Sequence, residues 1–243
     1  TCLGNHEFDY HPSGLSKIIN SARKQTKNLV PILSSNIVFS GEEEDRGLET
    51  LMEQGILKRT LMISRGGLTF GLFSLMGIEA TEVAPNAHPV TFDDPITSAR
   101  KYVSQLRKDG AQIIILISHS GIMKSSDGTW GGEDVDIANN VEGIDIIVGG
   151  HSHTPLSKPL KVKSTFILQA GSNTEFLGEA TFGYTKDNVR LKEYKLHEIN
   201  DSITGNNKVS EIIERAKDSI NKEVLEPIGY NFNTPIVKSL QKL

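Results

Sequence analysis

The sequence predicts an α/β protein with mixed sheets, and three observations support this fold class. Helical stretches alternate with apolar strands over most of the 243 residues. The runs 111–118 (AQIIILIS) and 144–150 (IDIIVGG) are almost continuously apolar, as in strands covered on both faces. From Phe166 to His197 the pattern changes to successive strands, which adds further strands to the sheets.

The elements of the first half follow in chain order. Apolar residues at helical spacing predict a helix over 12–25. The stretch 29–38 (LVPILSSNIV) is typical of a strand that leads into a turn, and the carboxylates at 42–45 (EEED) indicate a solvated loop. Two β-rich runs within 59–77 flank Gly66-Gly67, a pair that favours a hairpin.

The second half continues with helices and strands. A helix is expected over 95–109, because Asp94-Pro95 favours its start, and a shorter one over 133–141. The strands after Phe166 turn at Lys186-Asp187-Asn188, and a regular apolar stripe predicts a helix over 209–225.

One domain boundary is expected near residue 200, where NDSITGNN (200–207) interrupts the pattern. Residues 1–199 then form the main domain, and 200–243 form a linker helix and the start of a second domain. The last stretch, YNFNTPIVKSLQKL (230–243), matches no completed element.

Composition excludes several classes of function. The net charge of −4 offers no basic field for a nucleic-acid backbone or an anionic membrane. The longest apolar run, Ile113 to Ile117, is too short to span a bilayer. Cys2 is the single cysteine, which excludes an internal disulfide framework and a CxxC metal site.

Three short segments carry side chains suited to chemistry: GNHE (4–7), ISHSG (117–121) and GGHSHT (149–154). In two of them a histidine, His119 or His151, directly follows an apolar strand. The carboxyl ends of strands in an open α/β sheet are where ligands bind, so both imidazoles are expected there on neighbouring strands. Small residues around them allow close approach of a metal or a phosphate.

The pair His151 and His153 adds to this interpretation. In an extended stretch, a spacing of two places both imidazoles on one side, and imidazole suits zinc, iron, manganese or nickel. A single histidine at a strand end is more often structural, and Ser152 and Thr154 fit a simple turn. Together with GNHE (4–7), however, chance becomes a poor explanation.

In this order and spacing, GNHEFDY (4–10), ISHSG (117–121) and IDIIVGGHSHT (144–154) resemble the calcineurin-like metallophosphoesterases. More narrowly, they resemble the 5′-nucleotidase family of bacteria and animals. PILSSN (31–36) and LTFGLFSLMG (68–77) resemble further strands of that family. The resemblance extends over roughly residues 1–230.

The resemblance implies a four-layered α/β/β/α sandwich that holds two divalent metal ions (Zn, Mn, Fe, Mg or Ca), bridged by a carboxylate and a water. Asn5, His119 and His151 would bind one metal, and His153 stands where the family donates a ligand to the other. A water made acidic by the two cations would attack phosphorus in line with the leaving oxygen.

The same resemblance implies that the GNHE segment contacts the substrate. His6 would be the catalytic histidine that contacts the phosphate beside Asn5, and Asp9 the carboxylate that pairs with His6. Such a pair fixes the imidazole tautomer and favours the imidazolium, which stabilises charge on phosphorus or protonates a leaving oxygen. Glu7 and Phe8 are expected to be structural.

The chain departs from the family pattern in one large respect. The family's Asp-x-His and Gly-Asp motifs, which supply further ligands, lie before GNHE, and neither precedes it here. We therefore expect a catalytic domain truncated at both ends, without its first strands and without the family's C-terminal substrate-binding domain. His11 stands where the family usually has glycine; His88 and His197 are expected to have no role.

The expected function is metal-dependent hydrolysis of nucleotide phosphomonoesters, with a nucleotide or another small phosphoester as substrate. A 2′,3′-cyclic nucleotide phosphodiesterase or a nucleotide-sugar hydrolase remains open on the same metal centre. A nuclease is disfavoured by the acidic balance and by GNHE in place of GNHD. An inactive metal-binding remnant is the alternative from another class. Family resemblance places the protein in the periplasm, outside the cell or at its surface, without membrane insertion in this segment.

Overall fold

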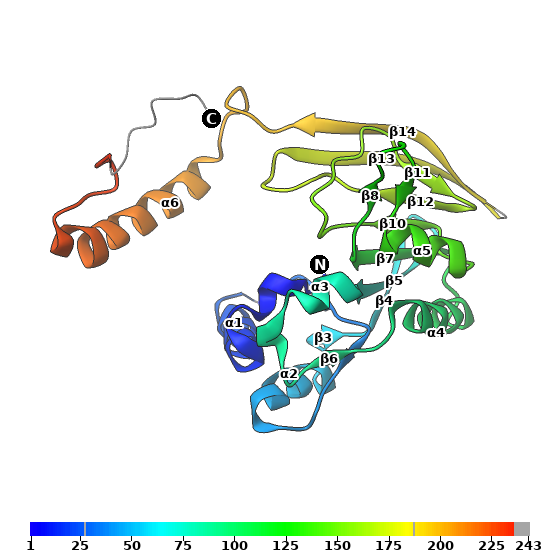
Figure 1. The fold of residues 1–243 in the computed structure, drawn as a ribbon, viewed down its shortest axis with the longest axis horizontal. Coiled ribbons are helices and arrows are strands. Elements are labelled where there is room, and N and C mark those ends of the chain that lie inside the picture. Colours follow the sequence, from blue (N-terminus) through cyan, green and yellow to red (C-terminus); the bar gives the residue numbers. More distant parts are fainter. Residues whose placement is uncertain (27, 187, 236–243) are drawn as a thin grey trace. The chain divides into compact units, whose positions relative to one another are not determined.

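The computed structural model describes residues 1–26, 28–186 and 188–235 and divides the chain into two compact units (Figure 1). The larger unit, Thr1–Glu198, contains the sheets and every candidate residue of the three short segments. In the smaller unit, Ile199–Leu243, the described elements are helical and cover residues 207–228.

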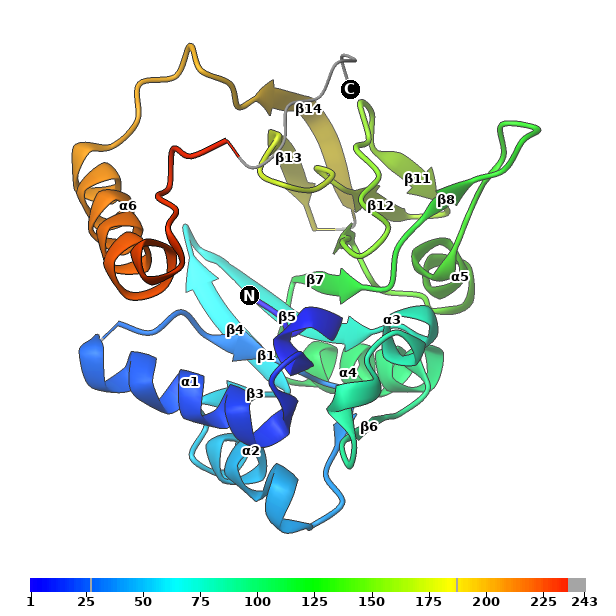
Figure 2. The same cartoon turned by 60° about the vertical axis from the view of Figure 1, so that its left-hand side comes forward.

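A six-stranded mixed sheet forms the centre of the larger unit (Figure 2). Four inner strands are parallel to one another, and one antiparallel strand closes each edge. The strand order is β11 (Leu160–Val162), β12 (Thr165–Leu168), β10 (Ile146–Val148), β7 (Ile113–His119), β5 (Leu68–Met76) and β4 (Thr60–Arg65). The predicted mixed α/β class is confirmed.

The register of the inner strands brings distant segments to one edge of this sheet. Val148 of β10 pairs with Ile117 of β7, and Met76 of β5 pairs with His119. The segments after Met76, His119 and Val148 therefore leave the sheet side by side at its carboxyl edge. The prediction that the two histidine segments follow neighbouring parallel strands is confirmed.

Successive side chains of β7 point to opposite faces of the sheet, so each face packs against a different layer of the protein. Ile114 and Leu116 pack in the core formed with α4 (Pro95–Lys108) and α5 (Glu133–Asn140). Ile113 packs on the opposite side, in a cluster with residues of the long hairpin β13 (Phe176–Thr185) and β14 (Asn188–Glu198). The successive strands predicted after Phe166 are β12, β13 and β14.

A second core lies around the N-terminal helices. α1 (His11–Gln25) and α2 (Glu43–Glu53) bury their apolar stripes in one cluster with Phe8 of the 3₁₀ turn η1 (Asn5–Phe8). Three further short elements complete this region: α3 (Ile78–Glu82), η2 (Pro85–Ala87) and β6 (Thr91–Phe92). The predicted helix over 12–25 and the hairpin within 59–77 are both confirmed.

One sequence prediction in this region is incomplete and one is wrong. The stretch 29–38 contains the predicted strand, β1 (Ile32–Leu33), and the turn after it, but a second strand, β2 (Ile37–Val38), follows; β1 pairs with β3 (Leu57–Lys58) and β2 with β6. The chain turns between them because the Asn36 amide bonds both backbone groups of Met76, at 2.9 and 3.1 Å. The acidic run 42–45 is not a loop: it begins α2, where carboxylates favour the helix N-terminus, and Asp45 is buried.

The remaining elements are short strands and the helices of the smaller unit. β8 (Met123–Lys124) and β9 (Trp130–Gly131) form a separate pair in the larger unit. In the smaller unit, α6 (Asn207–Ile220) continues into a π-helical turn, η3 (Asn221–Leu225), and a 3₁₀ turn, η4 (Glu226–Ile228). The predicted helix over 209–225 is confirmed. Among the described residues, no helix has both the length and the apolar character required to cross a membrane.

Two predictions fall partly outside the described residues. The turn expected at Lys186-Asp187-Asn188 includes residue 187, and the stretch 230–243 includes residues 236–243, which are not described. The domain division expected at residue 200 stays a prediction.

Candidate active site

Two candidate side chains that are far apart in the sequence meet directly. His119 ends β7, and Asn5 begins η1. His119 Nε2 lies 2.8 Å from Asn5 Oδ1, and Asn5 is 8% exposed. The N-terminal segment is held at this place by the backbone, because Leu3 N donates to Leu33 O at 3.2 Å. The structure thus brings together two of the residues that the sequence analysis identified.

The close approach of His119 depends on glycine at position 4. A β-carbon built on Gly4 would lie 2.7 Å from His119 Cε1, which is shorter than van der Waals contact. The Gly4 amide is in turn fixed by Glu7, whose Oε2 accepts its hydrogen bond at 2.6 Å. Glu7 therefore supports the shape of the turn, and Phe8, fully buried, packs behind it.

His119 is held in its neutral form. Burial, and to a smaller extent positive charge on His151, His6 and His153, lowers the pKa of His119 from 6.5 to about 4. At neutral pH the ring therefore keeps one nitrogen lone pair. The centroid of the His151 ring lies 5.1 Å from that of His119, so a second imidazole flanks the first.

The two histidines of the GGHSHT segment lie in a tight loop, not in an extended stretch. His151 and His153 have φ angles of 70° and 53°, in the left-handed region that residues with a β-carbon rarely adopt. The strand alternation that the sequence analysis invoked does not apply here, because the chain turns at both residues. His151 is half-buried beside His119, whereas His153 is exposed.

His6 and Asp9 form the pair that the sequence analysis expected. The Asp9 carboxylate lies 3.1 and 3.3 Å from His6 Nδ1, across one 3₁₀ turn. Both side chains are exposed, at 78% and 60%. Because Nδ1 is engaged by the carboxylate, the other ring nitrogen of His6 is the one available to a ligand. Asn86 Nδ2 donates to Asp9 O at 3.1 Å and holds this turn from the other side.

Two buried polar residues beneath the histidine segments were not identified from the sequence. Asp134 Oδ1 accepts a hydrogen bond from Ser118 Oγ at 2.5 Å, and Asp134 Oδ2 has no hydrogen-bond partner among the described residues. Desolvation raises the pKa of Asp134 to about 7. Gln169, 2% exposed, follows β12 and binds the loop that carries His151. The only sequence signal for Gln169 was a polar residue ending an apolar strand.

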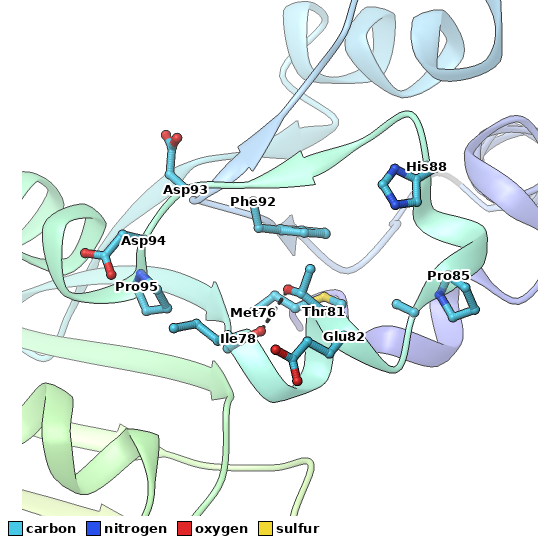
Figure 3. A pocket seen from close by; sticks show the side chains of 12 residues that line it. Met76, Ile78, Thr81, Glu82, Pro85, His88, Phe92, Asp93, Asp94 and Pro95 are labelled. Carbon is cyan, nitrogen blue, oxygen red and sulfur yellow. Dashed lines mark hydrogen bonds between the residues drawn. The ribbon is translucent and has the colours of Figure 1, made fainter.

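The other histidines lie elsewhere. His11 is exposed with a φ of 61°, and His197 pairs with Glu179 at 2.7 Å on the β13–β14 hairpin. His88 lines a cavity of about 400 Å³ between β6 and the β5–α3 segment. Figure 3 shows Phe92 of β6 facing Met76 and Thr81 across this space. None of the six candidate residues lines the cavity.

The donor atoms suit a divalent metal ion. The Asn5 amide oxygen and a neutral His119 imidazole converge beside the His151 ring, and oxygen with imidazole nitrogen is a donor set for zinc, iron or manganese. Within residues 1–26, 28–186 and 188–235, no three His, Cys, Asp or Glu side chains cluster as a metal site. The candidate set instead combines imidazoles with an amide.

Comparison with known proteins identifies the family to which the chain belongs. The family model of the calcineurin-like phosphoesterases matches residues 1–155, more than half of the chain. The chain belongs to this family. Its members are phosphoester hydrolases that use divalent metals, and they include 5′-nucleotidases and apyrases. The resemblance to the 5′-nucleotidases given by the sequence is confirmed.

Individual relatives agree with this class. A probable 5′-nucleotidase of Treponema pallidum is 31% identical over 152 residues, which cover 62% of this chain and 22% of that protein. A 2′,3′-cyclic-nucleotide 2′-phosphodiesterase/3′-nucleotidase of Salmonella typhimurium is 29% identical over 157 residues, covering 62% and 23%. The chain spans less than a quarter of the length of these two relatives.

A solved structure shows the same fold. The crystal structure of a 5′-nucleotidase precursor from Thermus thermophilus superposes with a TM-score of 0.67 at 24% identity. The match covers 88% of this chain and 41% of that one. The expected metallophosphoesterase fold, with its central mixed sheet, is therefore confirmed.

Proposed function

We propose that this chain belongs to a hydrolase that removes phosphate from nucleotide phosphomonoesters in a metal-dependent reaction. The observation that carries the proposal is the convergence of Asn5 and His119 at 2.8 Å beside His151, at the carboxyl edge of the sheet. Family membership supports the reaction class, and the 5′-nucleotidases among the relatives support the nucleotide substrate.

Asn5, His119 and His151 would hold one divalent cation, and His153 would contribute toward a second. Such cations supply an acidified water as nucleophile and neutralise charge on the phosphate. The residues of the chain would present their donor atoms to the cation in the correct protonation state. The low pKa of His119 keeps its imidazole unprotonated, so binding a cation displaces no proton from that ring at neutral pH.

His6 is proposed as the residue that acts on the substrate. Its engaged Nδ1 leaves the opposite ring nitrogen to contact a phosphate oxygen, and the exposure of the ring allows a ligand to reach it. Asp9 fixes the tautomer and stabilises positive charge on the imidazole. A protonated His6 stabilises the charge that develops on phosphorus or donates its proton to the leaving oxygen. Asn5 lies next to it and would bind both cation and substrate.

A second candidate substrate class is supported by one relative. The Salmonella typhimurium protein carries the name of a cyclic-nucleotide phosphodiesterase as well as of a 3′-nucleotidase. A 2′,3′-cyclic nucleotide phosphodiester would need the same cation donors and the same His6–Asp9 pair. A nucleotide sugar is the third candidate substrate and would use the same cation donors. We also infer a periplasmic, extracellular or surface location, by analogy with the family.

Phosphate release by the protein expressed from its complete gene tests this proposal. The substrates are AMP, UDP-glucose and 2′,3′-cyclic AMP, each assayed with Mn²⁺ and with an excess of EDTA; for the cyclic and sugar substrates, product is separated by chromatography. We expect Mn²⁺-dependent turnover, fastest with AMP, that EDTA abolishes. Equal rates with Mn²⁺ and EDTA, or no turnover of any substrate, would contradict the proposal.

A further inference from the structure

The loop that carries His151 and His153 is unusual in its backbone. It contains two non-glycine residues in the left-handed region, at φ angles of 70° and 53°, separated only by Ser152. Each such residue is disfavoured in isolation and persists only where its surroundings determine the conformation. One buried side chain, Gln169, contacts the loop at both of its ends.

The Gln169 side chain binds the loop on both sides of the two histidines. Its Nε2 donates to Gly150 O at 2.7 Å, directly before His151. Its Oε1 accepts from Thr154 N at 2.6 Å, directly after His153. The partners fix the orientation of the amide, because a carbonyl only accepts and a backbone N–H only donates.

The same side chain also connects the two histidine segments. Gln169 Oε1 accepts a further hydrogen bond from Ser152 Oγ at 3.1 Å. Ser152 Oγ in turn accepts from Ile122 N at 3.0 Å, three residues after His119. Gln169 is 2% exposed, so a change of its side chain removes these hydrogen bonds from a buried position, where unpaired polar groups are costly.

We propose that Gln169 is a positioning residue that holds the 149–154 loop in the conformation presenting His151 and His153, and so sets the affinity of the site for a divalent cation. The inference rests on the proposed function, in which these histidines bind a cation. Gln169 is not a catalytic residue, because its hydrogen bonds go to the loop and not to a ligand. An amide is required, since one donor and one acceptor must face opposite ends of the loop.

The substitution Gln169→Glu separates this role from simple packing. It preserves size and the acceptor for Thr154 N but places a carboxylate oxygen against Gly150 O. Gln169→Leu preserves volume and removes all the hydrogen bonds. The control is Gln112→Leu, which removes an exposed amide that accepts from Thr69 N at 2.9 Å, near the opposite end of β7.

The measurement is the dissociation constant for Mn²⁺, obtained by titrating the metal-free protein from the complete gene, together with its melting temperature in EDTA. We expect Gln169→Glu and Gln169→Leu to weaken Mn²⁺ binding about 10- to 100-fold, as outer-shell substitutions do. Gln112→Leu should bind Mn²⁺ as the unmodified protein does. Excess Mn²⁺ should restore turnover by the Gln169 variants, which loss of packing alone would not predict.

The outcomes distinguish failure of this inference from failure of the proposed function. Unmodified protein that binds no Mn²⁺ contradicts the proposed function and this role with it. Unmodified protein that binds Mn²⁺, with both Gln169 variants equal to it in affinity, overturns only the role of Gln169. Should both variants fail to fold, Ser152→Ala tests the same network: weakened Mn²⁺ binding at an unchanged melting temperature is expected, and unchanged affinity would contradict the proposal.

Discussion

His119 Nε2 lies 2.8 Å from Asn5 Oδ1, although 114 positions separate the two residues. One side chain ends the central strand β7 and the other begins η1, so two independent parts of the fold deliver donor atoms to one place. The backbone bonds of the N-terminal segment and the packing of Gly4 on His119 hold the two side chains there. Preorganisation of this kind lowers the cost of binding a ligand.

Gly4→Ala should disrupt this arrangement. The added β-carbon would lie 2.7 Å from His119 Cε1, so the His119 ring or the Gly4 backbone must shift and change the contact with Asn5. We expect a loss of about 1–3 kcal/mol in stability from overpacking, with weakened Mn²⁺ binding. Thermal melting and Mn²⁺ titration of the protein from its complete gene measure the two effects.

Gly131→Ala is the matched control, because a β-carbon at that position meets nothing within 4 Å. It should leave both the melting temperature and the Mn²⁺ affinity nearly unchanged. A Gly4→Ala variant as stable and as metal-competent as the control would show that the close packing of Gly4 on His119 has no role.

His6→Ala should separate catalysis from metal binding. His6 pairs with Asp9 and takes no part in the contact between Asn5 and His119, so its removal should lower kcat by about 10²- to 10⁴-fold while the bound metal stays constant. Asp9→Asn should have a smaller effect, since the imidazole remains but loses its carboxylate. Steady-state kinetics and metal analysis test this together.

His197→Ala serves as the control for this substitution, because it removes a histidine that also pairs with a carboxylate, Glu179. It should change neither kcat nor metal content. If His6→Ala loses as much metal as activity, His6 is a ligand and its assigned role is wrong.

Asp134→Asn should change how stability depends on pH. Desolvation raises the pKa of Asp134 from 3.8 to about 7 in the folded protein. Between these two values the folded state holds a proton that the unfolded state has released, so stability falls as pH rises through this interval and is lowest above it. A pKa difference of this size corresponds to a free-energy cost on the order of a few kcal/mol at pH 8.

The asparagine side chain cannot ionise, so the variant should lack this pH-dependent loss of stability. Melting temperatures of both proteins in EDTA at pH 5 and pH 8 measure the loss, because other titrating groups contribute equally to both proteins and cancel in the comparison. The unmodified protein should lose more stability than Asp134→Asn on going to pH 8. Parallel losses would mean that Asp134 titrates as an ordinary carboxyl group.

Much of the fold was predictable because local patterns and tertiary packing agree. The apolar runs before His119 and His151 became adjacent parallel strands, β7 and β10, as their continuous burial indicates. The prediction for the acidic run 42–45 was wrong for the opposite reason. Its charges indicate a loop exposed to solvent, whereas its place at the start of α2 and the burial of Asp45 depend on contacts with residues distant in the sequence.

The candidate site was predictable only where its residues lie in recognisable segments. Asn5 and His119 stand in such segments, and the structure brings them together. Gln169 could not be found in this way, because its importance comes from hydrogen bonds to residues 15 and 19 positions away. The left-handed backbone conformations of His151 and His153 could not be predicted either, because the local sequence indicates an extended segment.

The metal content of the His119→Ala variant tests the central claim most directly. The protein from its complete gene and the variant are loaded with Mn²⁺, freed of excess metal, and analysed for bound metal per chain, with His197→Ala treated in parallel. Because His119 is the half-buried, neutral imidazole that meets Asn5, we predict that His119→Ala holds clearly less Mn²⁺ than the unmodified protein, while His197→Ala holds the same amount. Full retention of Mn²⁺ by His119→Ala would contradict the assignment of Asn5, His119 and His151 as the metal-binding set.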